Sequence, residues 1–183
     1  MEQLFNQLSE TLLNNLNAGE HLKVAIGGEN SQFVRFSQSK VRQSGLVDDA
    51  SLSIVLINNE RTCNGSFTLT GNITADEETA MEELNRLRDE VGTLPKDPFV
   101  VMPEDTGSSR EEYNGSLMNH ETAVSALSPA MQGVDLAGIW ASGRIFTGNA
   151  NSAGQKHWFA TDTFSLDYSL ITPDERMVKG TFA

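Results

Sequence analysis

The chain has little that a disulfide, a cysteine-rich metal site or a membrane span would need. Cys63 is the single cysteine among 183 residues, which excludes an internal disulfide and any site built from several cysteines. No stretch approaches the ~18 consecutive apolar residues of a membrane span, and the N-terminus lacks the basic-then-apolar order of a signal peptide. We therefore expect a cytoplasmic protein that makes no contact with a membrane.

Basic residues are also scarce. Thirteen Lys and Arg stand against 25 Asp and Glu, giving a formal net charge of -12, which opposes phosphate binding over most of the surface. We expect no direct contact with nucleic acid. The one local basic concentration is Arg35, Lys40 and Arg42. Its two interpretations are ordinary solvated strand residues and a small anchor for an acidic peptide or a partner subunit, since arginine presents paired donors to carboxylates.

Three stretches carry helical periodicity, with leucines or other apolar residues every three or four positions: 2–18, 75–91 and about 109–128. Gly19 and Gly92 stand where the first two should end. Capping-box matches that begin at Thr74 and Ser108 predict where the second and third helices start.

The stretch from His21 to Thr70 alternates with period two, as strands do. Gly27-Gly28-Glu29-Asn30 predicts a turn between its first two strands. Asn58-Asn59-Glu60 is a connection of hairpin length between the last two, and Cys63 shares one face of the final strand with apolar residues. The pattern predicts an antiparallel meander in which Cys63 is a small buried hydrophobe.

The C-terminal third predicts a hairpin and a further strand. Residues 164–170 alternate strictly, and the Gly/Asn/Ser run 148–154 separates them from an earlier strand. A turn at Thr172-Pro173-Asp174-Glu175 precedes the alternating tail 177–182. Because the chain stops inside a predicted strand, we expect either a fragment or the front half of a longer polypeptide.

Together these patterns predict an α+β fold, an antiparallel sheet of six or more strands with about three helices packed on one face. We expect residues 1–183 to form a single domain. The proline-containing stretch 93–107 would be an internal linker.

Catalytic motifs are missing. His120-Glu121 has the beginning of a zinc-protease helix, but the second histidine, needed at Val124 or Ser125, is absent. We therefore expect His120 and Glu121 to be surface residues of a helix. No nucleophile elbow, phosphate-binding loop or dinucleotide fingerprint occurs, so we expect no catalytic residue, metal ligand or cofactor in this chain.

Two stretches resemble motifs of one family, TldD/PmbA, once called modulators of DNA gyrase. The early one is Phe33–Gly45, and the later one is Ala141-Ser-Gly-Arg144 followed by Asn151-Ser-Ala-Gly154 and Thr163-Phe-Ser-Leu166. The order of predicted elements also resembles the N-terminal half of that family. The resemblance extends over nearly the whole chain.

The resemblance implies a part of a cytoplasmic metallopeptidase system in which two related subunits pair and act on unfolded or short peptides. It implies a homologous partner subunit, as a homodimer or heterodimer, and a peptide substrate. The zinc helix His-Glu-x-x-x-His of the catalytic subunit lies downstream of the matched region. Zinc is therefore expected only in the C-terminal half of a catalytic family member.

The leading functional hypothesis is a non-catalytic scaffold, a peptide-channel or subunit-pairing domain of such a protease. Open strand edges would let a peptide or partner add as another strand. Two rivals remain, a peptidase in its own right and a regulatory protein-binding module of the gyrase-modulator type. The residues we expect at peptide or partner contacts are Arg35, Lys40, Arg42, Arg144, Asn151 and Ser152.

Overall fold

The structure is a computed structural model that describes residues 1–172, 174 and 176–183, with the side chain of His120 left aside. In chain order its elements are α1 (Glu2–Asn14), β1 (Glu20–Ser37), β2 (Lys40–Asn58), β3 (Arg61–Thr68), α2 (Ile73–Val91), β4 (Ser108–Tyr113), α3 (His120–Leu127), the 3-10 helix η1 (Ser128–Met131), β5 (Asp135–Asn151), β6 (Lys156–Ile171) and β7 (Met177–Phe182). Between α2 and β4, residues 92–107 contain neither helix nor strand.

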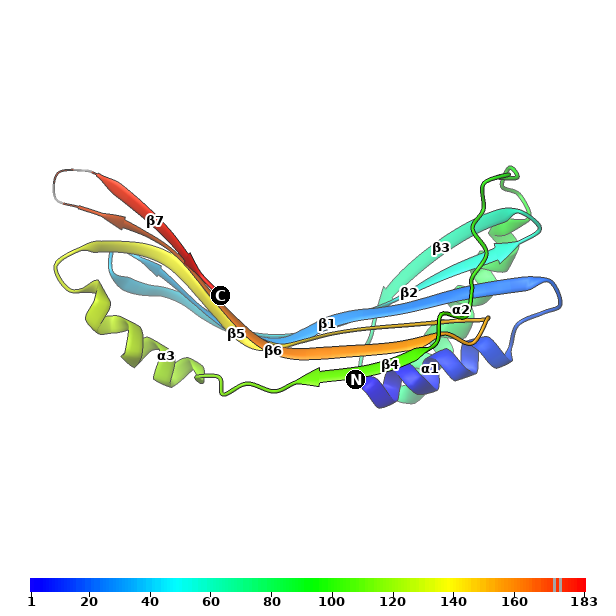
Figure 1. Cartoon of the computed structure of the whole chain (residues 1–183), viewed down its shortest axis with the longest axis horizontal. Helices are drawn as coiled ribbons and strands as arrows, with labels where there is room; N and C mark the ends of the chain where they lie inside the picture. The colour runs from blue at the N-terminus through cyan, green and yellow to red at the C-terminus, as the bar shows by residue number, and fades with distance from the viewer. Residues whose placement is uncertain (173, 175) are drawn as a thin grey trace. The chain divides into compact units, whose positions relative to one another are not determined.

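The described strands form one seven-stranded sheet in the order β3-β2-β1-β5-β6-β4, with β7 paired to β6 (Figure 1). The β2–β3 and β6–β7 pairs are antiparallel. The predicted α+β class, with an antiparallel sheet of six or more strands and about three helices, is confirmed. None of the helices in the described part of the chain is long and apolar enough to cross a membrane.

Contacts divide the chain into two compact units. Unit 1 comprises Met1–Gly28, Asp49–Glu111 and Phe146–Phe159, and unit 2 comprises Glu29–Asp48, Glu112–Ile145 and Ala160–Ala183. The divisions fall inside β1, β2, β4, β5 and β6. The prediction of a single domain stays a prediction, and each unit is described here by itself.

Unit 1 has its core between α1 and aromatic residues of the sheet. The Trp158 ring stacks on Phe5 of α1 and on Phe146 of β5, with centroids 6.2 and 5.7 Å apart. The α1 leucines at positions 8 and 12 are fully buried, as the fourfold spacing predicts. Helix α2 packs on α1 and on β3.

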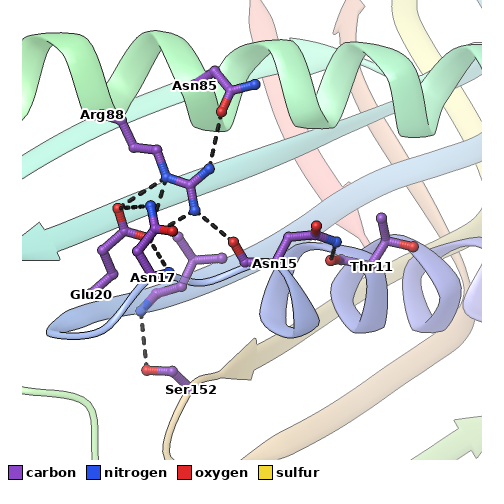
Figure 2. A network of polar contacts seen from close by, with 8 residues as sticks. Thr11, Asn15, Asn17, Glu20, Asn85, Arg88 and Ser152 are labelled. Carbon is purple, nitrogen blue, oxygen red and sulfur yellow. Dashed lines mark hydrogen bonds and ion pairs between the residues drawn. The ribbon is translucent and has the colours of Figure 1, made fainter.

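A buried ion pair ties α2 to the start of β1 (Figure 2). Arg88 donates to both carboxylate oxygens of Glu20, with Nε–Oε1 2.9 Å and Nη2–Oε2 2.8 Å, and also to the carbonyl of Asn15 at 2.6 Å. Asn17 donates two further hydrogen bonds to the same carboxylate, one from its backbone N–H and one from its side-chain amide. Residues 15–18 thus form a polar connection, and α1 ends at Asn14 instead of continuing to residue 18.

Unit 2 has a separate apolar core beneath α3. Its buried members come from β1, α3, η1 and β5: Val34, Phe36, Ala123, Met131, Leu136 and Trp140. Leu166 and Leu170 of β6 pack against this cluster. The alternation predicted for residues 164–170 therefore places its leucines on the core side, whereas Phe164 is 40% exposed.

The predicted turn at Gly27–Asn30 is wrong, because β1 runs unbroken through it. Gly28 is needed for a close approach instead: a Cβ there would lie 2.4 Å from the Asp49 carbonyl oxygen and 2.6 Å from Phe146 Cζ. The chain reverses later, at Gln38 and Ser39, which both have positive φ.

The hairpin predicted at 58–60 is confirmed. Asn58 pairs with Arg61, and the two residues between them, Asn59 and Glu60, have φ values of 50° and 59°. Cys63 on β3 is buried, with 5% of its surface exposed, as its strand face predicts.

The capping box at Thr74 places the N-cap of the second helix two residues too late. Helix α2 begins at Ile73, and its N-cap is Asn72, whose Oδ1 accepts from the N–H groups of Thr74 and Ala75. Asp76 is buried and accepts from the N–H groups of Thr70 and Gly71, fixing the connection that enters the helix.

The helix predicted over 109–128 is also wrong in its first half. Ser108–Tyr113 form strand β4, and the helix starts only at His120, capped by Asn119 Oδ1 accepting from Thr122 N–H at 2.8 Å. A capping-box match is local, whereas β4 gains sheet pairing with β6. Tertiary pairing overrides the local signal.

Candidate functional site

Strand β7 forms an edge of unit 2. It pairs with β6 in the register Leu166–Phe182, Tyr168–Gly180 and Leu170–Val178. Across the described strands, β7 has no other pairing partner. Among the described strands its outer backbone groups therefore have no ladder partner, which is where a further strand, of this polypeptide or of another, can pair.

The direction of those groups follows from one hydrogen bond. Thr172 N–H donates to the Arg176 carbonyl at 2.9 Å, so Thr172 and Arg176 form a hydrogen-bonded pair of the antiparallel ladder. Such pairs recur at every second residue, which assigns the N–H and C=O groups of Val178, Gly180 and Phe182 to β6. Those of Met177, Lys179 and Thr181 point to the free side, which we call the β7 edge.

One face of β7 is apolar. Val178 and Phe182 pair with Leu170 and Leu166, so they share the core side of the sheet, yet they are 58% and 66% exposed. Gly180 leaves the space in which the Tyr168 ring lies, because a Cβ there would be 2.5 Å from that ring.

An apolar cavity opens on this face. Its volume is about 320 Å³. Its lining combines η1 and α3 with the sheet: Phe36, Leu127, Ala130, Met131, Leu136, Leu166, Tyr168, Leu170 and Phe182. Phe182 therefore connects the cavity to the β7 edge.

The opposite face of β7 carries basic charge. Lys179 alternates with Val178 and so points to the other side of the sheet. There it lines a second cavity, of about 510 Å³, together with Arg35 and Asp167. Thr181 donates its hydroxyl to Asp167, whereas no ion pair of Arg35 or Lys179 occurs among the described residues. The charged groups of this second cavity sum to one positive charge.

Unit 2 has a second open edge at the start of β2. Strand β3 pairs with β2 only from Ser51 onward. Lys40 and Arg42 lie in the part of β2 that has no pairing with β3, and they are exposed, as are Val41 and Leu46. The predicted basic group is thus divided, because Arg35 lines the second cavity and the other two lie along β2.

Arg144 is held in a polar network within unit 2. Its guanidinium donates to Glu112 at 2.6 Å, to Asp162 at 3.1 Å and to the Asn114 side chain at 2.9 Å. The Gly115 N–H donates to Asp162, and this bond, followed by the Arg144 contact, holds the pKa of the Asp162 carboxyl below its ordinary value. These contacts fix the connection that follows β4.

Asn151 and Ser152 belong to unit 1, where β5 runs on to Asn151 and shortens the predicted 148–154 loop. Asn151 is buried; its side chain donates to the Glu104 carbonyl and accepts from Ala153 N–H. Ser152 Oγ accepts from Leu22 N–H at 3.1 Å, the contact drawn in Figure 2. Both side chains hold the turn together, and their predicted role in partner contact stays a prediction.

The described residues contain no group of three or more His, Cys, Asp or Glu side chains placed to hold a metal ion. Burial raises the pKa of the Cys63 thiol, with Glu90 nearby acting in the same direction, which suits a packing role and opposes reactivity. Glu121 is exposed on α3. The prediction that His120 is a surface residue concerns a side chain outside those that the structure describes. The predicted turn at 172–175 includes Pro173 and Glu175, which are also outside the described residues.

Comparison with known proteins adds the fold relationship. No family model matches the chain, and no curated protein matches it. Solved structures do match, over 99% of the chain. One is a proposed modulator of a DNA gyrase from Thermotoga maritima, with 14% identity, a TM-score of 0.66 and 42% of that protein covered. A protein of the same description from Bacteroides thetaiotaomicron has 13% identity, a TM-score of 0.68 and 44% covered.

The third match is TldE from Thermococcus kodakarensis, with 12% identity, a TM-score of 0.65 and 42% of its chain covered. The chain has the fold of the matched part of TldE. The resemblance inferred from the motifs is thereby confirmed at the level of fold. The chain spans less than half the length of each of these three proteins.

Sequence reasoning missed the main residues of the β7 edge in this TldE-like fold. The alternation of residues 177–182 correctly predicts a strand, but Lys179 and Phe182 were not predicted contact residues. The available signal was the alternation itself, which separates Val178 and Phe182 from Lys179. The missing information was that the strand joins β6 at an edge, above a cavity.

Proposed function

We propose that this chain is a non-catalytic N-terminal domain of a TldD/PmbA-like metalloprotease system. It would bind extended peptide segments by strand addition, either as a peptide channel or in pairing with a homologous subunit. The fold supports this proposal, since the three matched structures described above are named as TldE or as proposed gyrase modulators. Zinc and peptide-bond cleavage would belong to another part of the system.

The observation that carries the proposal is the open β7 edge. Main-chain bonds give an added strand affinity with little dependence on its sequence, which suits a system acting on unfolded or short peptides. Met177, Lys179 and Thr181 offer outward backbone groups, and the β7 side chains that flank them are largely exposed. Exposed apolar side chains on an edge strand are typical of an interaction site, so the apolar face of β7 favours a binding role.

A proline at position 181 tests strand addition. Thr181→Pro removes one outward N–H while leaving the N–H groups of Gly180 and Phe182 for β6. Thr181→Val is the matched control, because it also loses the hydroxyl bond to Asp167 but keeps the N–H. We would measure binding of fluorescent peptides by anisotropy and of a coexpressed homologous subunit by light scattering.

We expect the wild type and Thr181→Val to bind with the same affinity. Thr181→Pro should bind at least about tenfold more weakly, the equivalent of about 1.4 kcal/mol. Equal binding by all three proteins, with circular dichroism showing them folded, would remove strand addition at β7. Peptide binding without subunit binding would identify a peptide channel, and the converse a pairing domain.

A regulatory protein-binding role is the alternative, favoured by the names of two matched structures. In that case the edge would bind a DNA-associated protein. The net charge of -12 opposes direct contact with DNA. Pull-down with purified gyrase subunits, compared with a homologous protease subunit, separates the two roles.

A further inference from the structure

We infer that the β7 edge selects an extended peptide in which apolar side chains alternate with acidic ones. This inference rests on the proposed function and adds the class of peptide that would be preferred. Strand addition alone fixes only the backbone. The two faces of β7 differ in chemistry, and side chains of an added strand alternate between those faces.

The apolar half of the pattern follows from the core-side face. A strand added at the β7 edge places every second side chain beside Val178, Gly180 and Phe182. Exposed apolar surface on Val178 and Phe182 would be removed from water by apolar partners. Beyond Phe182, the cavity of about 320 Å³ has space for an aromatic or long aliphatic side chain among Leu127, Met131 and Leu136.

The acidic half follows from the opposite face. The remaining side chains of the added strand lie on the side of Lys179 and Thr181. Lys179 and Arg35 line the cavity there with one carboxylate, Asp167, so the local charge is positive within a chain of net charge -12. A carboxylate of the peptide would pair with Lys179, and a lysine in its place would be repelled.

A second copy of β7 fits this edge poorly. Two β7 strands that pair antiparallel about their centres place Lys179 of one copy near Lys179 of the other, and like charges opposite each other destabilise a sheet. The charge thus favours an acidic peptide over self-pairing. Dimerisation through β7 becomes an outcome that the experiment can detect.

The test uses three labelled heptapeptides and the full chain. The first alternates glutamate with valine and phenylalanine, the second replaces each glutamate by lysine, and the third has the composition of the first with its apolar residues in one block. We expect the first to bind at least about fivefold tighter than the other two at low salt. Its advantage over the lysine peptide should shrink at high salt.

Two variants assign the preference to the two faces. Lys179→Glu should reverse the order of the first two peptides. Ala130 is an exposed η1 residue that lines the apolar cavity. Ala130→Phe should weaken binding of the phenylalanine-containing peptide about fivefold, whereas a peptide with alanine in place of phenylalanine should keep its affinity. Lys156→Glu, an exposed lysine of unit 1, is the matched charge control and should leave the order unchanged.

The outcomes separate this inference from the proposed function. If all three peptides bind equally and Thr181→Pro abolishes their binding, strand addition stands and the selectivity is wrong. If Lys179→Glu leaves the order unchanged, the acidic half of the pattern is wrong. If no peptide binds, or sedimentation shows a dimer that Thr181→Pro dissociates, both the selectivity and the peptide-channel role fail.

Discussion

Glu20 at the start of β1 and Arg88 near the end of α2 form a paired contact, with Arg88 donating to both carboxylate oxygens. Only 4% of the Glu20 side chain and 20% of the Arg88 side chain are exposed. Because Arg88 also bonds the Asn15 carbonyl just after α1, one guanidinium joins three elements of unit 1. This pair is the clearest electrostatic contribution to the stability of that unit.

We predict that Arg88→Ala lowers the free energy of unfolding by about 2–4 kcal/mol, since it leaves the Glu20 carboxylate buried without its partner. Urea denaturation followed by circular dichroism measures the change. Arg86→Ala is the control on the same helix. Its side chain is 50% exposed and pairs with Glu83, so we expect less than about 0.5 kcal/mol.

The same pair predicts a pH dependence. Arg88 holds the pKa of the folded Glu20 carboxyl below its ordinary value of 4.5. A lowered folded pKa contributes stability that is present above the unfolded pKa and is lost as pH falls through the folded pKa. The stability difference between the wild type and Glu20→Gln should therefore be full at neutral pH and decline below 4.5. A difference that stayed constant down to acid pH would contradict the ionic origin.

Gly27 and Gly28 offer a matched pair of substitutions. A Cβ at Gly28 would collide with the Asp49 carbonyl and the Phe146 ring, whereas a Cβ at Gly27 would meet nothing within 4 Å. We predict that Gly28→Ala lowers the free energy of unfolding by about 1–3 kcal/mol and that Gly27→Ala changes it by less than about 0.5 kcal/mol. Equal effects of the two substitutions in thermal denaturation would contradict the close approach of Asp49 and Phe146 to Gly28.

Ser152 should act through structure. Ser152→Ala leaves the Leu22 N–H without its side-chain acceptor, and we predict a loss of about 1–3 kcal/mol in the free energy of unfolding. Hydrogen exchange at the Leu22 amide should accelerate. Ser152→Thr retains the hydroxyl and serves as the control. Loss of partner binding at unchanged stability would instead support the contact role predicted from the motif.

Arg144→Met tests whether that arginine is a contact or a support. Without the guanidinium, Glu112 and Asp162 lose their shared cation. We predict that the free energy of unfolding falls by about 1 kcal/mol and that peptide binding at the β7 edge does not change. NMR titration should show the pKa of Asp162 rise but stay below its ordinary value, because Gly115 still donates to it. Arg176→Met, which removes an ion pair of an 83% exposed arginine, is the control.

The sequence predicts best where local and tertiary preferences agree. The leucine spacing of α1, the Asn59-Glu60 hairpin and the burial of Cys63 all follow from short patterns, and the structure has each of them. The motif resemblance also led to the correct fold. In each case the local pattern favours the conformation that the packed chain adopts.

The errors occur where a residue serves a distant partner. Gly28 looks like a turn residue, but it is a glycine because the β2 backbone and Phe146 pass beside it. Ser108 looks like a cap, but its strand joins β6, which lies almost fifty residues further along the chain. The β7 edge could not be foreseen as a site, since pairing order and cavities depend on contacts that no short window contains.

The open β7 edge also has a consequence for handling the purified chain. Lys179 disfavours pairing of two β7 strands, but the exposed apolar side chains of this edge can still associate between molecules. In neutral solution the strong negative charge keeps copies apart. That repulsion vanishes near the isoelectric point of about 4.6. Mild acidification should therefore turn a well-behaved solution turbid, and an excess of a strand-adding peptide should keep it clear.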